Sequence, residues 1–170
     1  MATMMKRVLL ATGFLVLALA ALVVVARLTT RSVDGIGCDP AEKVAYHVHA
    51  HLTIMDRGRI SYPPAGVGIH PEHLCLYWLH THRPSGVIHI EAPHRFTPTL
   101  GQFFDIWGEP LSNTQVWNFK VGPSTAMKVY VDRKLHAGNP RDIPLFNHTA
   151  VTIEIGPPFK APPIPDFSTG

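Results

Sequence analysis

Cysteine is scarce in this 170-residue chain, which contains only Cys38 and Cys75. An even number of cysteines predicts a disulfide bond if the domain is exported from the cytoplasm. If the two sulfurs are bonded to each other, neither can bind a metal ion or act as a nucleophile. Two unpaired, buried thiols are the alternative. Beyond residue 31 the only methionines are Met55 and Met127, which argues against a thioether site for Cu(I).

Charged residues are also few, at 16% of the chain, and the formal net charge is only +3. The basic residues are scattered and form no stripe or block, so nothing in the sequence indicates binding to nucleic acid. The chain has no internal repeat, no heptad pattern and no Ser-His-Asp spacing. These absences leave a small domain of ordinary composition whose chemistry must come from other residues.

One long apolar run stands at the N-terminus. Residues 8–26, "VLLATGFLVLALAALVVVA", contain no charge and follow Lys6 and Arg7. A membrane-spanning helix needs about 20 apolar residues, so we expect an uncleaved transmembrane signal anchor over residues 8–28. A cleaved signal peptide is the alternative. In both cases the rest of the chain is expected outside the cytoplasm, in the periplasm or at the cell surface.

The pattern of proline and glycine divides the rest of the chain. We expect a short cytoplasmic N-terminus over residues 1–7, a linker over 29–37 and a histidine-rich metal-binding domain over 38–155. Residues 156–170, "GPPFKAPPIPDFSTG", are rich in proline, which interrupts helices and inner strands. This segment is therefore predicted to form an extended tail.

Within residues 38–155 most patterns are those of strands. Residues 46–55, "YHVHAHLTIM", alternate strictly, and further strands are predicted in "RISYPPAGVGI", "LCLYWLHTH", "GVIHIEA", "MKVYVD" and "AVTIEIG". One helix is predicted in "TPTLGQFFDIWG", with Thr97 or Thr99 as its N-cap and Gly108 at its end. Together these elements predict an α+β fold, mostly antiparallel β with one main helix.

The closing segment adds a resemblance to a known fold. Residues 143–158, "IPLFNHTAVTIEIGPP", resemble the last strands of β-grasp proteins, with a proline-leucine step before the terminal strand. The resemblance implies that the domain is β-grasp-like.

Histidine is the abundant reactive residue, with 11 in the chain, and several of them alternate along the first predicted strand. Side chains on a strand point to opposite faces in turn. His47, His49 and His51 should therefore share one face, while Val48 and Ala50 point into the core on the other.

A second histidine run, "YWLHTHRPSGVIHIEA", is predicted to form a hairpin around a four-residue loop, Arg83–Gly86. This register places His80 opposite His89 and Trp78 opposite Glu91, on the non-core face. If this hairpin neighbours the first strand, seven ligand-type side chains gather on one face: His47, His49, His51, His80, His82, His89 and Glu91.

Imidazole nitrogens together with a carboxylate suit a divalent transition metal. Zinc and Cu(II) both favour imidazole, and two histidines with one carboxylate can hold non-haem iron. His70 and His73, in the loop "IHPEHLC", could extend the site. The stretch "LHTHRPSG" resembles the start of the metallo-β-lactamase metal motif, but Pro84 and Ser85 stand where that motif continues with aspartate and histidine.

Three functional classes follow from this pattern. The first is a membrane-anchored protein that captures, delivers or senses copper or zinc outside the cytoplasm, with a membrane-protein partner. The second is a hydrolase or lyase that uses a metal-bound water, with Glu91 as its acid or base. The third is a scaffold or assembly subunit without metal, whose proline-rich tail binds a partner. A surface that changes with the protonation of its histidines is a further alternative.

Overall fold

The computed structural model describes residues 32–169, so the anchor expected over residues 8–28 lies outside the described part of the chain. Within residues 32–169, no helix has the length and hydropathy needed to cross a membrane.

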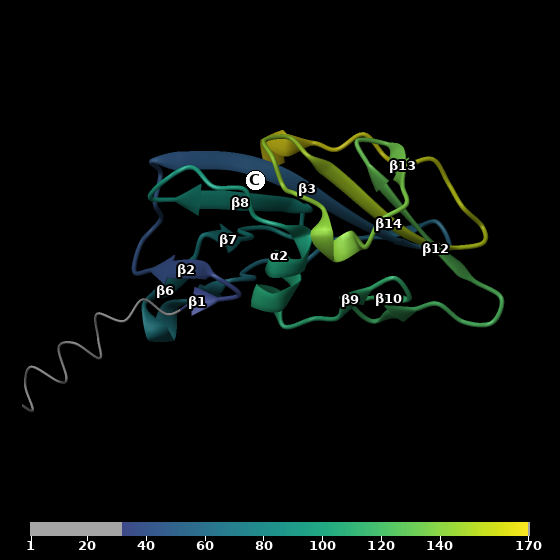
Figure 1. The fold of residues 1–170 in the computed structure, drawn as a ribbon, viewed down its shortest axis with the longest axis horizontal. Helices are drawn as coiled ribbons and strands as arrows, with labels where there is room; N and C mark the ends of the chain where they lie inside the picture. Colours follow the sequence, from purple (N-terminus) through teal and green to yellow (C-terminus); the bar gives the residue numbers. More distant parts are fainter. Residues whose placement is uncertain (1–31, 170) are drawn as a thin grey trace, which may run out of the picture. The chain divides into compact units, whose positions relative to one another are not determined.

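The largest sheet has seven strands, and the long strand β3 (Tyr46–Asp56) runs through it (Figure 1). In spatial order its main path is β13 (Lys134–His136), β12 (Ala126–Val131), β14 (Ala150–Gly156), β3, β8 (Val87–Ala92) and β7 (Leu79–His80). The short strand β4 (Arg59–Ser61) pairs with the second half of β3. All neighbours are antiparallel except β14 and β3, which are parallel. The prediction of a mostly antiparallel fold is confirmed.

Two smaller sheets flank this one. The first has the order β1 (Ser32–Val33), β2 (Ile36–Asp39), β6 (Cys75–Tyr77) and β5 (Ile69–His70), and the second has the order β11 (Phe119–Lys120), β10 (Gln115–Val116) and β9 (Leu111–Ser112). A disulfide between Cys38 and Cys75 joins β2 to β6, with the Cα atoms 5.2 Å apart, which confirms the predicted pairing. Strands β1 and β2 begin inside the segment expected to be a linker, so residues 32–37 belong to the folded domain.

The predicted hairpin before Arg83 is only partly correct, because its first strand is divided between two sheets. Residues Cys75–Tyr77 pair with β2 and β5 in the smaller sheet, whereas Leu79–His80 pair with β8 in the large one. The division falls at Trp78, whose indole Nε1 donates a hydrogen bond to Asp39 at 2.9 Å. The predicted register nevertheless holds, since His80 lies opposite His89.

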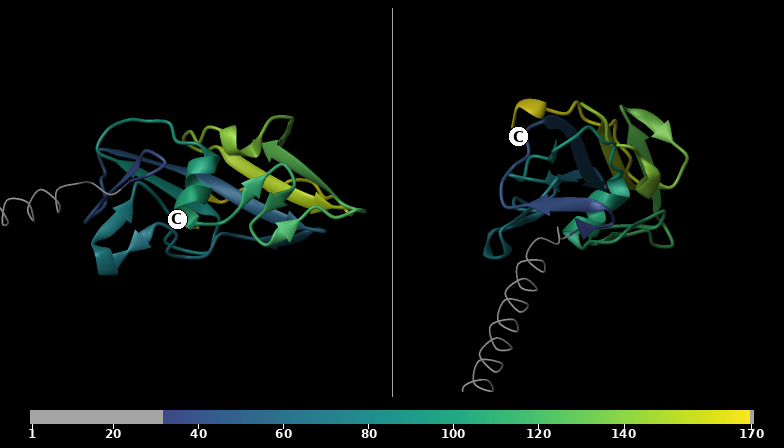
Figure 2. Two further views of the ribbon diagram at one scale, coloured as in Figure 1. Left: turned by 60° about the horizontal axis from the view of Figure 1, so that its bottom comes forward. Right: turned by 60° about the vertical axis from the view of Figure 1, so that its left-hand side comes forward.

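Helix α2 (Leu100–Trp107) is the α-helix of the described residues and lies across the strands (Figure 2). Thr99 is its N-cap and forms a capping box with Gln102, and Gly108 ends it in the left-handed conformation, as predicted from the sequence. Leu100, Phe103 and Phe104 are fully buried. They pack in one core cluster with the inward residues of the large sheet: Ala50, Leu52, Ile54, Ile88, Ile90 and Ile153. The face without histidines is therefore the core face.

Three short 3₁₀ helices complete the domain: η1 (Pro71–His73), η2 (Pro140–Asp142) and η3 (Phe167–Thr169). The proline-rich segment after Gly156 has no regular structure up to residue 166, but it does not extend away from the domain. It returns along the sheet to β3 (Figure 1). The backbone N–H of Lys160 donates to the buried Glu154 carboxylate at 2.6 Å, and Phe167 contacts the His51 ring.

Candidate metal centre

Three adjacent strands bring the two histidine runs together. In the large sheet β8 lies between β3 and β7. His89 on β8 is directly opposite His49 on one side and His80 on the other, and Glu91 is opposite His47. All these side chains lie on the face away from α2 and the core cluster, because strand residues alternate between faces. The predicted convergence of the two runs is therefore confirmed.

The rings within each His-x-His pair converge. The Nε2 atoms of His47 and His49 are 3.0 Å apart, and those of His80 and His82 are 3.2 Å apart. Two nitrogens bound at about 2.0–2.1 Å to one tetrahedral zinc ion would lie about 3.3 Å apart. Each pair thus has nearly the spacing that a shared ion requires. Without an ion, one ring of each pair can donate a hydrogen bond to the other.

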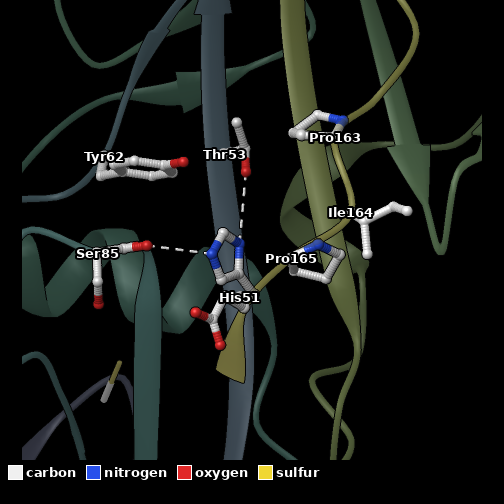
Figure 3. A pocket seen from close by; sticks show the side chains of 8 residues that line it. His51, Thr53, Tyr62, Ser85, Pro163, Ile164 and Pro165 are labelled. Carbon is white, nitrogen blue, oxygen red and sulfur yellow. Dashed lines mark hydrogen bonds between the residues drawn. The ribbon is translucent and has the colours of Figure 1, made fainter. Parts of the chain in front are cut away.

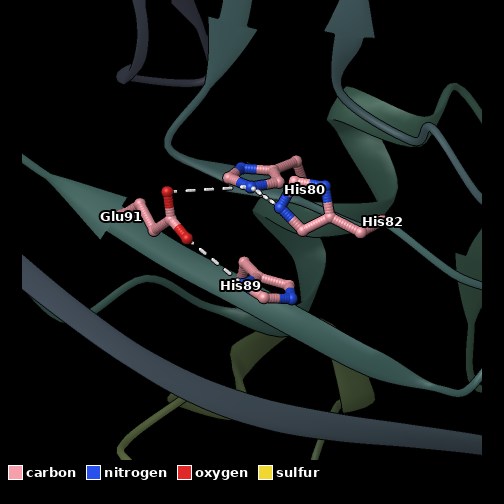
Figure 4. Close-up of side chains that lie close together, drawn as sticks. All are labelled: His80, His82, His89 and Glu91. Atoms are coloured by element: carbon pink, nitrogen blue, oxygen red, sulfur yellow. Dashed lines mark hydrogen bonds and ion pairs between the residues drawn. The ribbon is translucent and has the colours of Figure 1, made fainter. Parts of the chain in front are cut away.

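Glu91 lies among these rings. Its Oε1 is 3.2 Å from Nε2 of His47 and 3.2 Å from Nδ1 of His89, and its Oε2 is 3.9 Å from Nε2 of His80. Figure 4 shows the carboxylate and the rings of His80, His82 and His89 turned toward one another. Oε2 is buried and has no hydrogen-bond partner. A buried carboxylate oxygen without a donor is costly, and a cation beside it would remove that cost.

His89 is the central imidazole of the cluster. Its ring lies 4.5 Å, centroid to centroid, from both His49 and His82, with the planes nearly perpendicular. It stacks with His47 and with His80 at 5.8 and 5.3 Å. Its Nε2 atom is buried and has no hydrogen-bond partner. A second unpartnered polar atom therefore belongs to the same cluster.

Two groups of side chains satisfy the geometry of a metal site. One comprises His80, His82, His89 and Glu91, and the other comprises His47, His49 and His89. Within each group the candidate ligand atoms all lie within 4.8 Å of one another. These residues can hold a metal ion.

The cluster is more buried than a surface sheet face would be. His80 is 0% exposed, His89 5% and Glu91 3%, whereas the side chain of His47 is 40% exposed. The non-core face is thus covered at β7 and β8 and open at the start of β3. The predicted non-core face is therefore correct for His80, His89 and Glu91, but the alternating pattern does not indicate that these three side chains are buried there.

Burial determines the protonation of the site. Desolvation lowers the pKa of His80 to about 4, and desolvation together with the neighbouring imidazoles lowers the pKa of His89 to about 3. Desolvation, with a contribution from His47, also lowers the pKa of His49. These rings are therefore neutral near pH 7, which is the form that binds metals. Burial raises the pKa of Glu91, and repulsion from Glu42 adds to this effect.

Two supporting contacts were not expected from the sequence. Nδ1 of His80 lies 2.9 Å from the carbonyl oxygen of Tyr77, which can accept a hydrogen bond from Nδ1–H and so leave Nε2 as the ligand atom. Glu42 lies in the loop before β3, with its carboxylate 3.4 Å from Nε2 of His82. An isolated glutamate in a polar loop carries no local signal that would place it at the site.

His51, the third histidine of β3, takes a different environment and joins neither ligand group. Its Nε2 lies 3.1 Å from the carbonyl oxygen of Ser85, and its Nδ1 lies 3.4 Å from the hydroxyl of Thr53 (Figure 3). It lines a cavity of about 260 Å³. The other lining residues are Thr53, Tyr62, Ser85, Pro163, Ile164, Pro165 and Asp166. Opposite His51 on β8 stands Val87, which offers no ligand.

His70, at the end of β5, and His73, in η1, also lie outside the two groups. His70 and His73 are exposed beside Glu72, whose carboxylate is 3.5 Å from Nδ1 of His70 and 3.7 Å from Nε2 of His73. The structure thus assembles four imidazoles and one carboxylate around His89, with His51, His70 and His73 outside.

In comparisons with known proteins, this chain matches no family model, no curated protein and no solved structure.

Proposed function

We propose that the protein binds a divalent transition metal, zinc or copper, and that it captures, delivers or senses this metal outside the cytoplasm. The observation that carries the proposal is the convergence of two His-x-His pairs on a buried carboxylate, with Nε2 separations of 3.0 and 3.2 Å. Rings so close would repel each other if protonated, and a bound cation stabilises the arrangement.

The donor set supports the choice of metal. It consists of imidazole nitrogens and one carboxylate, which suits zinc and Cu(II) and also allows non-haem iron. Both cysteines are in the disulfide, so neither sulfur is a ligand. A soft Cu(I) site is not part of the proposal.

The place of action is also proposed. The apolar run at residues 8–26 supports a membrane anchor, and the disulfide supports an oxidising compartment such as the periplasm or cell surface. We further propose that the fold is β-grasp-like, because residues 143–158 resemble the last strands of β-grasp proteins. The proposed partner is a membrane protein that receives or supplies the metal.

A second candidate is a hydrolase or lyase that uses a metal-bound water. Glu91 favours this candidate, because burial raises its pKa and a carboxyl of raised pKa can act as general acid or base. A catalytic centre keeps one coordination position for water, whereas a carrier can fill all positions with protein ligands. The coordination number of the bound metal therefore separates the two candidates.

The direct test measures bound metal in the full chain purified in mild detergent. Mass spectrometry of the wild type is compared with a variant carrying His80→Ala and His82→Ala together. The matched control carries His70→Ala and His73→Ala, which removes two exposed histidines outside the cluster. We expect bound zinc or copper in the wild type and the control, and less bound metal in the His80/His82 variant.

Two results would contradict the proposal. If the wild type binds neither zinc nor copper above background, the cluster has no metal role. If the control loses as much metal as the His80/His82 variant, binding depends on surface histidines rather than on the cluster.

A further inference from the structure

We propose that the cluster holds two metal ions, one at each His-x-His pair, with the Glu91 carboxylate between them. This inference rests on the proposed function and specifies the stoichiometry of the same site.

The cluster is symmetric about β8. The pair His47–His49 stands on β3 at one side, and the pair His80–His82 stands at the other side, on β7 and just after it. The two outer rings His47 and His80 both stack with His89, with interplanar angles of 27° and 11°. His49 and His82 both meet His89 edge-on at 4.5 Å. Each pair therefore has the same relation to the central imidazole.

The cluster contains more donors than one zinc ion can use. Five imidazoles and one carboxylate exceed the four ligands of a zinc ion, so a single ion bound by His80, His82, His89 and Glu91 would leave the His47–His49 pair unused. Within each His-x-His pair the two Nε2 atoms already converge, at separations of 3.0 and 3.2 Å. Two ions would use each pair without rearrangement.

The buried Glu91 carboxylate lies between the two pairs. Oε1 of Glu91 is 3.2 Å from Nε2 of His47, in the first pair, and Oε2 is 3.9 Å from Nε2 of His80, in the second. The two oxygens thus face different pairs. Two-metal sites hold their ions about 3.5–4 Å apart, and an anion between two cations reduces their repulsion. Glu91 is the residue in the cluster that can place a negative charge beside both metal ions.

The test is the number of metal ions bound by the full chain in mild detergent, after removal of metal with a chelator and titration with Zn(II). We expect two equivalents for the wild type. One equivalent is expected for the variant His47→Ala/His49→Ala and one for the variant His80→Ala/His82→Ala. Glu91→Gln keeps the shape of the side chain but removes its charge, so it should weaken binding of the second ion at least tenfold.

The outcomes separate this inference from the proposed function. A wild type that binds one ion overturns the two-ion centre and leaves a metal-binding protein, whereas a wild type that binds none overturns both. Circular dichroism shows whether the variants fold. If they do not, titration of the wild type with Co(II) decides by electron paramagnetic resonance. If the resonance signal per Co(II) ion decreases as the added Co(II) rises from one to two equivalents, the two ions are coupled, which supports the inference. A signal per ion that stays constant over this range overturns it.

Discussion

Nδ1 of His89 lies 3.2 Å from Oε1 of Glu91, two residues along the same strand, while Nε2 of the same ring is buried without a partner. When Nδ1–H of His89 donates this hydrogen bond to the carboxylate, Nε2 carries the lone pair of the neutral ring and can bind a metal ion. A carboxylate that orients a histidine in this way is common beside metal ions. The relationship explains how one glutamate can both fix the central imidazole and carry charge for the site.

A methyl group at Gly68 should weaken metal binding. This glycine has φ +74°, and a Cβ there would lie 2.5 Å from the carbonyl oxygen of Leu79 and 3.3 Å from Cβ of His80. Gly68→Ala should therefore displace β7 and lower zinc affinity at least tenfold. Gly66→Ala is the matched control, since its φ is +81° but a Cβ there meets nothing within 4 Å. Equal zinc affinities for the two variants in calorimetric titration would contradict this prediction.

The metal-free protein should lose stability as the pH falls from about 6.5. His80 and His89 have folded pKa values of about 4 and about 3, so the unfolded chain takes up protons first. The contribution of these neutral histidines to the free energy of unfolding is fully present above pH 6.5. It is lost as the pH falls toward the pKa values of the folded protein. One pKa unit corresponds to 1.36 kcal/mol, so His80 alone contributes a loss on the order of 3 kcal/mol.

Glu91 acts with the opposite sign, because its raised pKa costs stability as the pH rises through the folded value. We expect the histidines to dominate, since the pKa of His49 is lowered as well. Urea unfolding with excess chelator, followed by tryptophan fluorescence, should give a lower midpoint at pH 5 than at pH 7. A midpoint that is equal or higher at pH 5 would show that the buried rings do not titrate as described.

Replacing both cysteines by serine should destabilise the domain. The Cys38–Cys75 bond closes a loop with a sequence separation of 37 residues. In the chain-entropy model, a loop of this length contributes about 4 kcal/mol. The double variant should show this decrease in the free energy of unfolding relative to the oxidised wild type. Strand β6 leads directly into β7, so metal affinity should decrease as well, and an unchanged affinity would show that β7 is held independently of the disulfide.

Removing residues 157–170 should lower stability without removing metal. The truncation leaves the buried Glu154 carboxylate without the Lys160 N–H, and it exposes the His51 ring that Phe167 contacts. A lost hydrogen bond to a buried charge costs about 1–3 kcal/mol, and metal content should stay the same because no tail residue belongs to either ligand group. Glu154→Gln, with the tail intact, separates the loss of charge from the loss of the segment.

A truncated chain that binds no metal would connect the tail to the site. If metal is retained but a complex with a membrane partner is lost, the scaffold interpretation gains support.

Local patterns were sufficient to predict much of the centre. Histidines that alternate with Val48 and Ala50 on one strand must share a face, whatever the rest of the fold. The loop length between His82 and Val87 was enough to set His80 opposite His89. The capping residues Thr99 and Gly108 were likewise enough to predict where the helix begins and ends, since both act within one turn of its ends.

Other features depend on contacts between distant segments and have no local signal. His80 and Glu91 are buried although they lie on the non-core face, and the alternating pattern does not indicate this burial. The strand that ends at His80 divides at Trp78, where the indole bonds to Asp39 far earlier in the sequence. His51 alternates in phase with His49, yet it bonds to the Ser85 carbonyl and stays outside the cluster. Strand periodicity gives the face of a side chain but not its neighbours.

The most direct measurement is anomalous diffraction at the zinc edge from crystals of the zinc-loaded full chain. The account predicts anomalous peaks within bonding distance of the Nε2 atoms of His47 and His49 on one side of His89, and of His80 and His82 on the other. The absence of any peak in this cluster, or peaks only at exposed histidines such as His70 and His73, would contradict it.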